Sequence, residues 1–258
     1  MSDLTRFGII ATVIQVLVLF VVIAKTNRLI KKGKSIFLPF FFILAMMSYV
    51  LSDLYWVAYD FLKPDTRMPI AANEIGECAM VLLLCAGLDS LLADKRKVAG
   101  EVLYAFLFIA ANIALWIVWS GEWVQDILFG IPYIYFLWLL IRGIRTRGTM
   151  TRKELSFALV TSVLVLATLV FIRFVEGFVR SFALLACYLE MLVLIVWLGI
   201  KSFRSKDFFV ATTFFLWTIL SMFATPAPYY NVPFFANTVA LPMMFVALKK
   251  ELAADDLC

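Results

Sequence analysis

The sequence contains no histidine. Histidine is the usual general base near neutral pH, a frequent ligand of zinc and iron, and the commonest pH-sensing side chain. Its absence from these 258 residues excludes histidine-dependent membrane hydrolases, phosphatases and acyltransferases.

Other sequence motifs that indicate a cofactor or an enzymatic reaction are also missing. There is no glycine-rich phosphate loop, and no lysine lies inside an apolar run, which excludes a retinal Schiff base. Asp89 follows Gly87-Leu88, which departs from the Gly-x-Gly-Asp pattern of intramembrane aspartyl proteases. We therefore expect no cofactor and no metal, and favour a protein that is not an enzyme. Acid–base chemistry by two carboxylates, Asp53 and Glu77, stays open.

Charged residues are scarce and apolar residues dominate. They make up 16% and 64% of the chain, and the mean hydropathy is +0.97. Apolar runs of about twenty residues recur, each long enough to cross a bilayer, and in lipid such a run must be a helix. We predict an all-α integral membrane protein with one polytopic domain over residues 1–258. The predicted spans are 7–24, 36–59, 71–92, 98–119, 125–141, 155–174, 181–200, 208–224 and 232–248.

The basic residues indicate an orientation. Of the 23 Lys and Arg residues, 18 fall in connections on one side of the predicted spans and five on the other. Because basic loops stay in the cytoplasm, this bias predicts an outside N-terminus, a cytoplasmic C-terminus and an odd number of spans. It also explains the net charge of +5, so we expect no nucleic-acid partner. The expected location is the cytoplasmic membrane of a bacterium.

A recurring offset of 101 residues suggests an internal duplication. The segment 83–89, Leu-Leu-Cys-Ala-Gly-Leu-Asp, resembles 184–190, Leu-Leu-Ala-Cys-Tyr-Leu-Glu, and Ile131-Pro132-Tyr133 resembles Val232-Pro233-Phe234. Two parallel four-helix units would follow, the second to fifth and the sixth to ninth predicted spans, and such repeats are common in transporters. Chance matching in a sequence rich in Leu and Phe is the alternative. Gly76 and Gly87 would allow close helix packing within one chain or in a homo-oligomer.

Ionisable residues inside spans point to a site, because they are costly in lipid and usually face the bundle interior. With the orientation above, several gather in the outer half, with Glu190 below them. The candidate substrate-binding residues are Asp53, Trp56, Asn73, Glu74, Glu77, Arg173, Glu176 and Glu190. They predict an acidic pocket open to the outside, with Arg173 as its counter-charge. Alternatively, Glu74 complements a helix dipole, Glu176 is solvated and Arg173 snorkels.

Other charges have an ordinary interpretation. Asp89, Glu101 and Glu154 lie at the predicted inner boundary, where charged residues are common. Pro242, by contrast, lies well inside the last span and should free a backbone carbonyl and kink the helix.

An outward acidic pocket favours a transporter or permease for a small polar or cationic solute, with or without proton coupling. Besides the bilayer, its partner would be that small molecule. Two alternatives stay open: a ligand-sensing module that signals through a cytoplasmic partner, and a carboxylate-dependent lipid-modifying enzyme.

Overall fold

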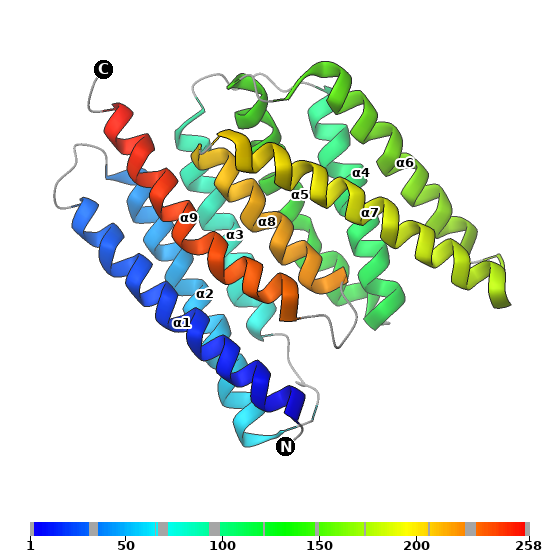
Figure 1. Ribbon diagram of the computed structural model, residues 1–258, viewed down its shortest axis with the longest axis horizontal. Coiled ribbons are helices and arrows are strands. Elements are labelled where there is room, and N and C mark those ends of the chain that lie inside the picture. Colours follow the sequence, from blue (N-terminus) through cyan, green and yellow to red (C-terminus); the bar gives the residue numbers. More distant parts are fainter. Residues whose placement is uncertain are drawn as a thin grey trace. The chain divides into compact units, whose positions relative to one another are not determined.

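The computed structural model describes most of the chain, and within that part it contains nine α-helices and no strand (Figure 1). The described residues are 3–30, 36–64, 66, 72–92, 99–120, 122–147, 150–172, 174–205, 207–224 and 231–255. The helices are α1 (Asp3–Ile30), α2 (Phe37–Leu62), α3 (Ala72–Ser90), α4 (Ala99–Ser120), α5 (Trp123–Thr146), α6 (Arg152–Ile172), α7 (Gly177–Ser205), α8 (Phe208–Ala224) and α9 (Asn231–Asp255).

Six of these helices are long and apolar enough to cross a membrane: α1, α2, α4, α5, α6 and α9. Two shorter apolar helical stretches, Gly177–Cys187 and Phe208–Met222, lie in α7 and α8. The prediction of an all-helical, multi-pass membrane bundle is therefore confirmed. The number of nine crossings, the orientation and the duplication stay predictions.

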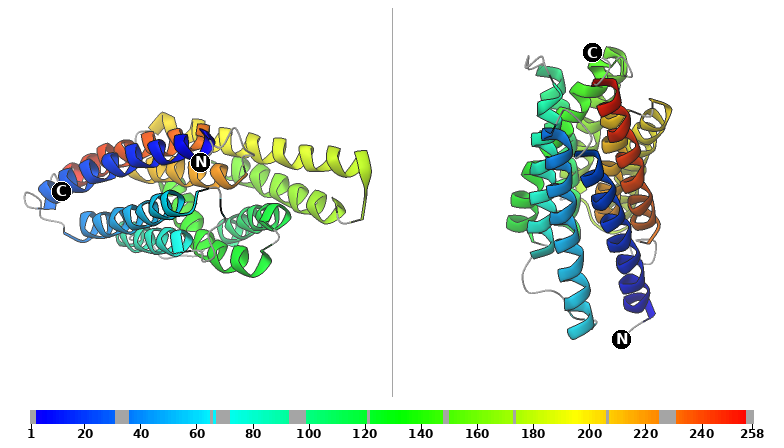
Figure 2. Two further views of the ribbon diagram at one scale, coloured as in Figure 1. Left: turned by 90° about the horizontal axis from the view of Figure 1, so that it is seen from below. Right: turned by 90° about the vertical axis from the view of Figure 1, so that its left-hand side faces the viewer.

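The chain divides into two compact units. Unit 1 contains α1, α2, α3 and α9, and unit 2 contains α4 to α8. In unit 1, α1 lies beside α9 in one layer and α2 beside α3 in another (Figure 2). Its core includes Phe42, Met46 and Tyr49 of α2, and the rings of Phe7 and Phe235 meet edge to face between α1 and α9.

In unit 1, α2 and α3 approach closely at a glycine. A Cβ atom at Gly76 would lie 2.9 Å from Cβ of Ser52 and 3.1 Å from the carbonyl oxygen of Ser48. Small residues permit such backbone approach between membrane helices. The sequence-based expectation of close packing at Gly76 is confirmed, and it occurs within one chain.

In unit 2, α5 has a long buried stretch from Phe136 to Ile144. The ring of Phe108 in α4 meets Trp217 of α8 edge to face, with centroids 4.3 Å apart. The start of α6 is fixed by a capping box: the Glu154 backbone N–H donates to Oγ1 of Thr151, and the Thr151 N–H donates back to the Glu154 carboxylate.

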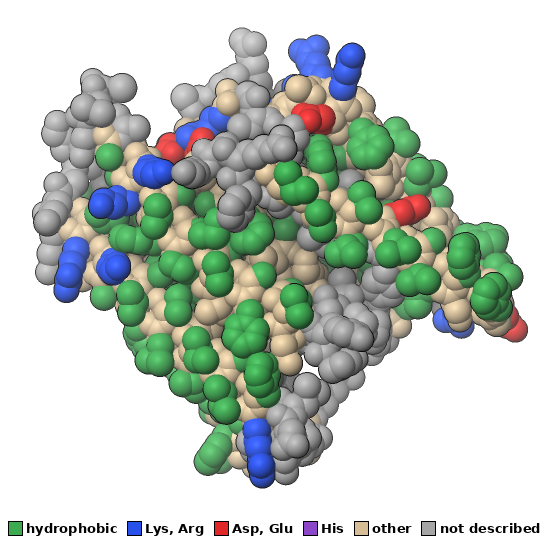
Figure 3. Space-filling view, in the orientation of Figure 1, with side chains coloured by type: hydrophobic (Ala, Val, Ile, Leu, Met, Phe, Trp, Pro, Cys, Tyr) green, Lys and Arg blue, Asp and Glu red, His purple; other side chains and the backbone are tan. Residues whose placement is uncertain are grey.

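The outer surface of α1 is typical of a lipid-facing helix. Apolar side chains cover its middle, and basic side chains lie toward its ends (Figure 3). Ile10, Leu17 and Val21 are exposed along the middle, while Arg6 and Lys25 are exposed nearer the two ends. Such an apolar band between charged ends fits a helix that crosses the hydrocarbon core.

Candidate binding site

The candidate site is built around Asp53, a buried acid in α2. Its residue is only 7% exposed. Asp53 lies nine residues before the end of α2 at Leu62, about 13 Å along the axis at the rise of an α-helix. A carboxyl group at this depth in an apolar helix is costly unless other groups stabilise it.

Two polar side chains from other helices complete a hydrogen-bonded chain, which we call the Asp53 network (Gln15, Asp53 and Thr238). Gln15 of α1 donates from Nε2 to Oδ2 of Asp53 at 2.9 Å. The Thr238 hydroxyl of α9 lies 2.9 Å from Oε1 of Gln15 and 3.0 Å from the carbonyl oxygen of Phe234, and can donate to either. All three residues are buried, and Gln15 is fully so. The network therefore joins α1, α2 and α9.

Pro242 adds a further oxygen to this region. Proline has no N–H, so the carbonyl oxygen of Thr238, four residues earlier in α9, lacks its usual helical donor. One residue before Thr238, the Asn237 side chain donates to the Tyr49 hydroxyl of α2. A polar side chain and a released backbone carbonyl thus occur together at one turn of α9.

The Asp53 network contains no basic side chain. Within the described residues, the polar partner of Asp53 is the neutral amide of Gln15, and no Lys or Arg forms an ion pair with it. An ionised Asp53 would therefore be a buried charge stabilised by one neutral donor.

The residues predicted on α2 and α3 lie in unit 1 with Asp53, but they face other neighbours. Trp56 packs over Gly8 of α1. Ser52 donates to the backbone carbonyl of Asn73 at 2.8 Å, so Ser52 rather than Asp53 faces the start of α3. Asn73 and the two acids that follow it on α3, Glu74 and Glu77, are partly exposed. In the described part of the chain, the hydrogen bond of Asp53 goes to α1 and not to Glu77.

The other predicted residues belong to unit 2. Glu176 is exposed just before α7, and Arg173 lies outside the described residues. Glu190 is partly exposed on α7, and its Oε2 atom is buried without a hydrogen-bond partner in the described structure. A common pocket for all eight residues stays a prediction.

Gln15 and Thr238 were not among the predicted site residues. Gln15 is the only amide side chain in the apolar run 7–24, so a search for neutral polar residues inside spans would find it. Thr238 gives no such signal, because most threonines in helices bond to a carbonyl of their own helix.

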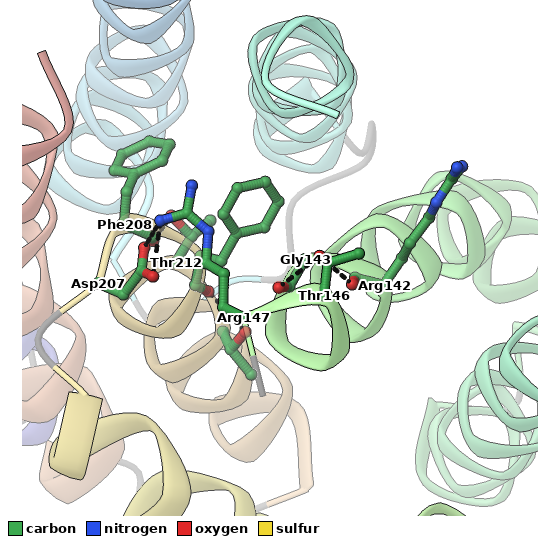
Figure 4. Close-up of polar contacts among 9 residues, drawn as sticks. Arg142, Gly143, Thr146, Arg147, Asp207, Phe208 and Thr212 are labelled. Atoms are coloured by element: carbon green, nitrogen blue, oxygen red, sulfur yellow. Dashed lines mark hydrogen bonds and ion pairs between the residues drawn. The ribbon is translucent and has the colours of Figure 1, made fainter. Parts of the chain in front are cut away.

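A second polar cluster lies at the end of α5 in unit 2. Arg145 forms an ion pair with Glu101 in the first turn of α4. Arg147 binds both carboxylate oxygens of Asp207 at 2.6 Å, directly before α8 (Figure 4). The Arg142 side chain, on the same helix, extends away from Asp207 and lies over the Trp138 ring.

The position of Glu101 at the inner boundary stays a prediction, but that prediction did not include its burial and its ion pair. Glu101 is 3% exposed, and both Arg142 and Arg145 act on its carboxylate. Its position next to a basic loop concealed this, because its partner Arg145 lies 44 residues further along the chain.

The two ion pairs should differ in strength. Arg145→Leu removes the cation that is paired with the buried Glu101 carboxylate. Breaking a buried ion pair costs up to about 3–5 kcal/mol, and the nearby Arg142 reduces this cost. Arg147 is about a third exposed, so Arg147→Leu should cost no more than about 1 kcal/mol. Thermal unfolding of both variants in detergent measures the difference. Equal unfolding midpoints would contradict it.

Metal binding by clustered side chains finds no support in the described residues, where no group of three or more Cys, Asp or Glu residues is placed to hold an ion. Three cysteines in that part of the chain, Cys78, Cys85 and Cys187, are free thiols.

No protein-family model, no curated protein and no solved structure matches this chain.

Proposed function

We propose that this protein transports a small polar or cationic solute across the membrane, and that Asp53 binds the solute cation or a coupled proton. One observation supports this. Asp53 is buried, and its partner in the described residues is the neutral amide of Gln15 and not a basic side chain.

The chemistry of the Asp53 network suits a positive charge. A carboxylate buried in an apolar bundle must be neutralised, by a proton or by a bound cation. The Asp53 carboxylate and the released carbonyl of Thr238 are oxygen acceptors, which are the groups that hold small cations and ammonium groups.

The position of Thr238 one turn before a proline in α9 also favours transport over a purely structural role. Transporter sites commonly use helices interrupted by proline or glycine, whose unpaired carbonyls coordinate ions. Pro242 provides such an interruption one turn after Thr238. The acids of α3, Glu74 and Glu77, would raise the local concentration of cations near unit 1.

Asp53→Asn should abolish transport. We would reconstitute the full chain in proteoliposomes with a trapped pH-sensitive dye and add Na⁺, K⁺ or small organic amines singly, recording tracer uptake and proton flux. Asn keeps the size of the side chain and its bond to Gln15 but loses the charge. We expect uptake of at least one cation by the unmodified protein, and none by Asp53→Asn at equal protein content.

The matched control is Glu251→Gln, an acid of α9 that lies outside the Asp53 network. It should transport at the unmodified rate. Equal flux in Asp53→Asn and the unmodified protein would contradict the role of Asp53. Saturable binding without flux of any solute would favour the sensing alternative, and lipid turnover without flux would favour the enzyme.

A further inference from the structure

The buried face of α4 in unit 2 carries polar side chains that the proposed function does not use. Glu101, Tyr104 and Asn112 are spaced by three and eight residues, so they lie within about 80° of one another around an α-helix of 3.6 residues per turn. All three are buried, and Tyr104 and Asn112 are completely so. They form a polar stripe about 16 Å long at the rise of an α-helix.

Several polar atoms along this stripe have no hydrogen-bond partner within the described residues. On α4 these are Oε2 of Glu101, the hydroxyl of Tyr104 and Oδ1 of Asn112. Two more such atoms are the indole N–H groups of Trp138 in α5 and Trp217 in α8, helices that pack against α4. We call these five residues the unpaired polar set. Leaving a buried polar atom without a partner costs about 1–3 kcal/mol.

Members of the unpaired polar set come from helices that pack together. The ring of Tyr104 contacts Phe108, with centroids 5.8 Å apart, and Phe108 contacts Trp217. On the side of α5, the Arg142 guanidinium lies over the Trp138 ring, 5.4 Å from its centroid, and acts electrostatically on Glu101. The set thus extends from the ion pair at Glu101 into the interior of unit 2.

The mixture of donors and acceptors identifies the ligand. A metal cation would satisfy the oxygens of Glu101 and Asn112, but not an indole N–H. An anion would accept from Trp138 and Trp217, but would be repelled by Glu101. Water both donates and accepts, and buried waters normally bridge polar groups of this kind.

We infer that unit 2 binds water molecules along the buried face of α4, forming a hydrated track from Glu101 toward Asn112 and Trp217. The track gives the interior of unit 2 a polar route that ends at the Glu101–Arg145 ion pair. This inference does not depend on the role proposed for Asp53, which lies in unit 1.

Hydroxyl-radical labelling with short X-ray pulses tests the track, because water bound beside a buried side chain produces radicals in place. The full chain in lipid nanodiscs would be exposed, and modification of each side chain followed by mass spectrometry. Each rate is divided by the rate of the same residue in the denatured chain. Phe136 and Phe215 are the matched controls, since both are fully buried rings of unit 2 without a polar atom.

We expect Tyr104 and Trp217 to be modified several-fold faster than Phe136 and Phe215 on this normalised scale. Rates for Tyr104 and Trp217 as low as those of the two phenylalanines would overturn the inference. Equally fast modification of all four side chains would also overturn it, because general loosening of unit 2 would then explain the labelling.

Discussion

Replacing Gly143 by alanine should destabilise unit 2 by about 1–3 kcal/mol or more, the usual range for adding atoms to a packed core. A Cβ atom at Gly143 would lie 1.9 Å from Cδ1 of Phe209, far inside van der Waals contact. Phe209 is completely buried in α8, so its ring has little room to move. The methyl group must therefore push α5 and α8 apart, which would also disturb Arg147 over the Phe209 ring.

Gly100→Ala provides the control for this prediction. The nearest atom to a Cβ at Gly100 is Cδ2 of Leu155 at 3.9 Å, an ordinary contact. Alanine is a better helix former than glycine, so Gly100→Ala should leave stability unchanged or raise it by up to about 1 kcal/mol. The unfolding midpoints of both variants in the same detergent make the comparison.

A second variant identifies the cause. If the clash with the ring is responsible, Phe209→Ala should cost much less in the Gly143→Ala background than alone, a non-additivity expected for residues in contact. Additive effects of the two substitutions, or a Gly143→Ala protein as stable as the unmodified one, would show that α5 and α8 do not meet at this position.

Gln15→Leu is expected to destabilise unit 1 by about 1–3 kcal/mol, because it leaves a buried Asp53 without its donor. Leucine fills a similar volume, so loss of packing contributes little. The double variant Gln15→Leu/Asp53→Leu should recover most of the loss, since replacing both partners by apolar groups is often nearly neutral. Equilibrium unfolding in detergent, read by tryptophan fluorescence, gives the two free energies.

The double variant also separates structure from function. A stable double variant without transport would mean that Asp53 is kept for its charge rather than for the fold. A double variant less stable than Gln15→Leu alone would contradict the hydrogen bond as the source of the effect.

The helical class and the burial of Asp53 followed from the sequence, because a carboxylate inside an apolar run is a strong local signal. The other two members of the Asp53 network did not follow from the sequence. Gln15 and Thr238 are neutral, and Thr238 is 223 residues from Gln15 along the chain. Their meeting depends on α1 packing against α9, which no periodicity within either helix indicates.

The burial of a charged side chain was harder to predict than the helix that contains it. Glu101 and Glu154 look alike in the sequence, since each lies close to a basic connection. Glu154 became part of a helix cap, whereas Glu101 was covered by α5 and paired with Arg145. Local sequence determines the cap, because Thr151 is three residues away. Burial of Glu101 depends on a helix more than forty residues further along the chain.

The packing of α1 against α9 has a consequence for how the protein is made. Residues 94–224, the whole of unit 2, are synthesised between α3 and α9. The ribosome therefore completes unit 2 as one continuous segment before it has synthesised α9, the fourth helix of unit 1. Contacts between such distant segments form late, because a long loop must close first. Until α9 packs against α1, Gln15 lacks Thr238, so the Asp53 network is complete only after α9 has joined unit 1.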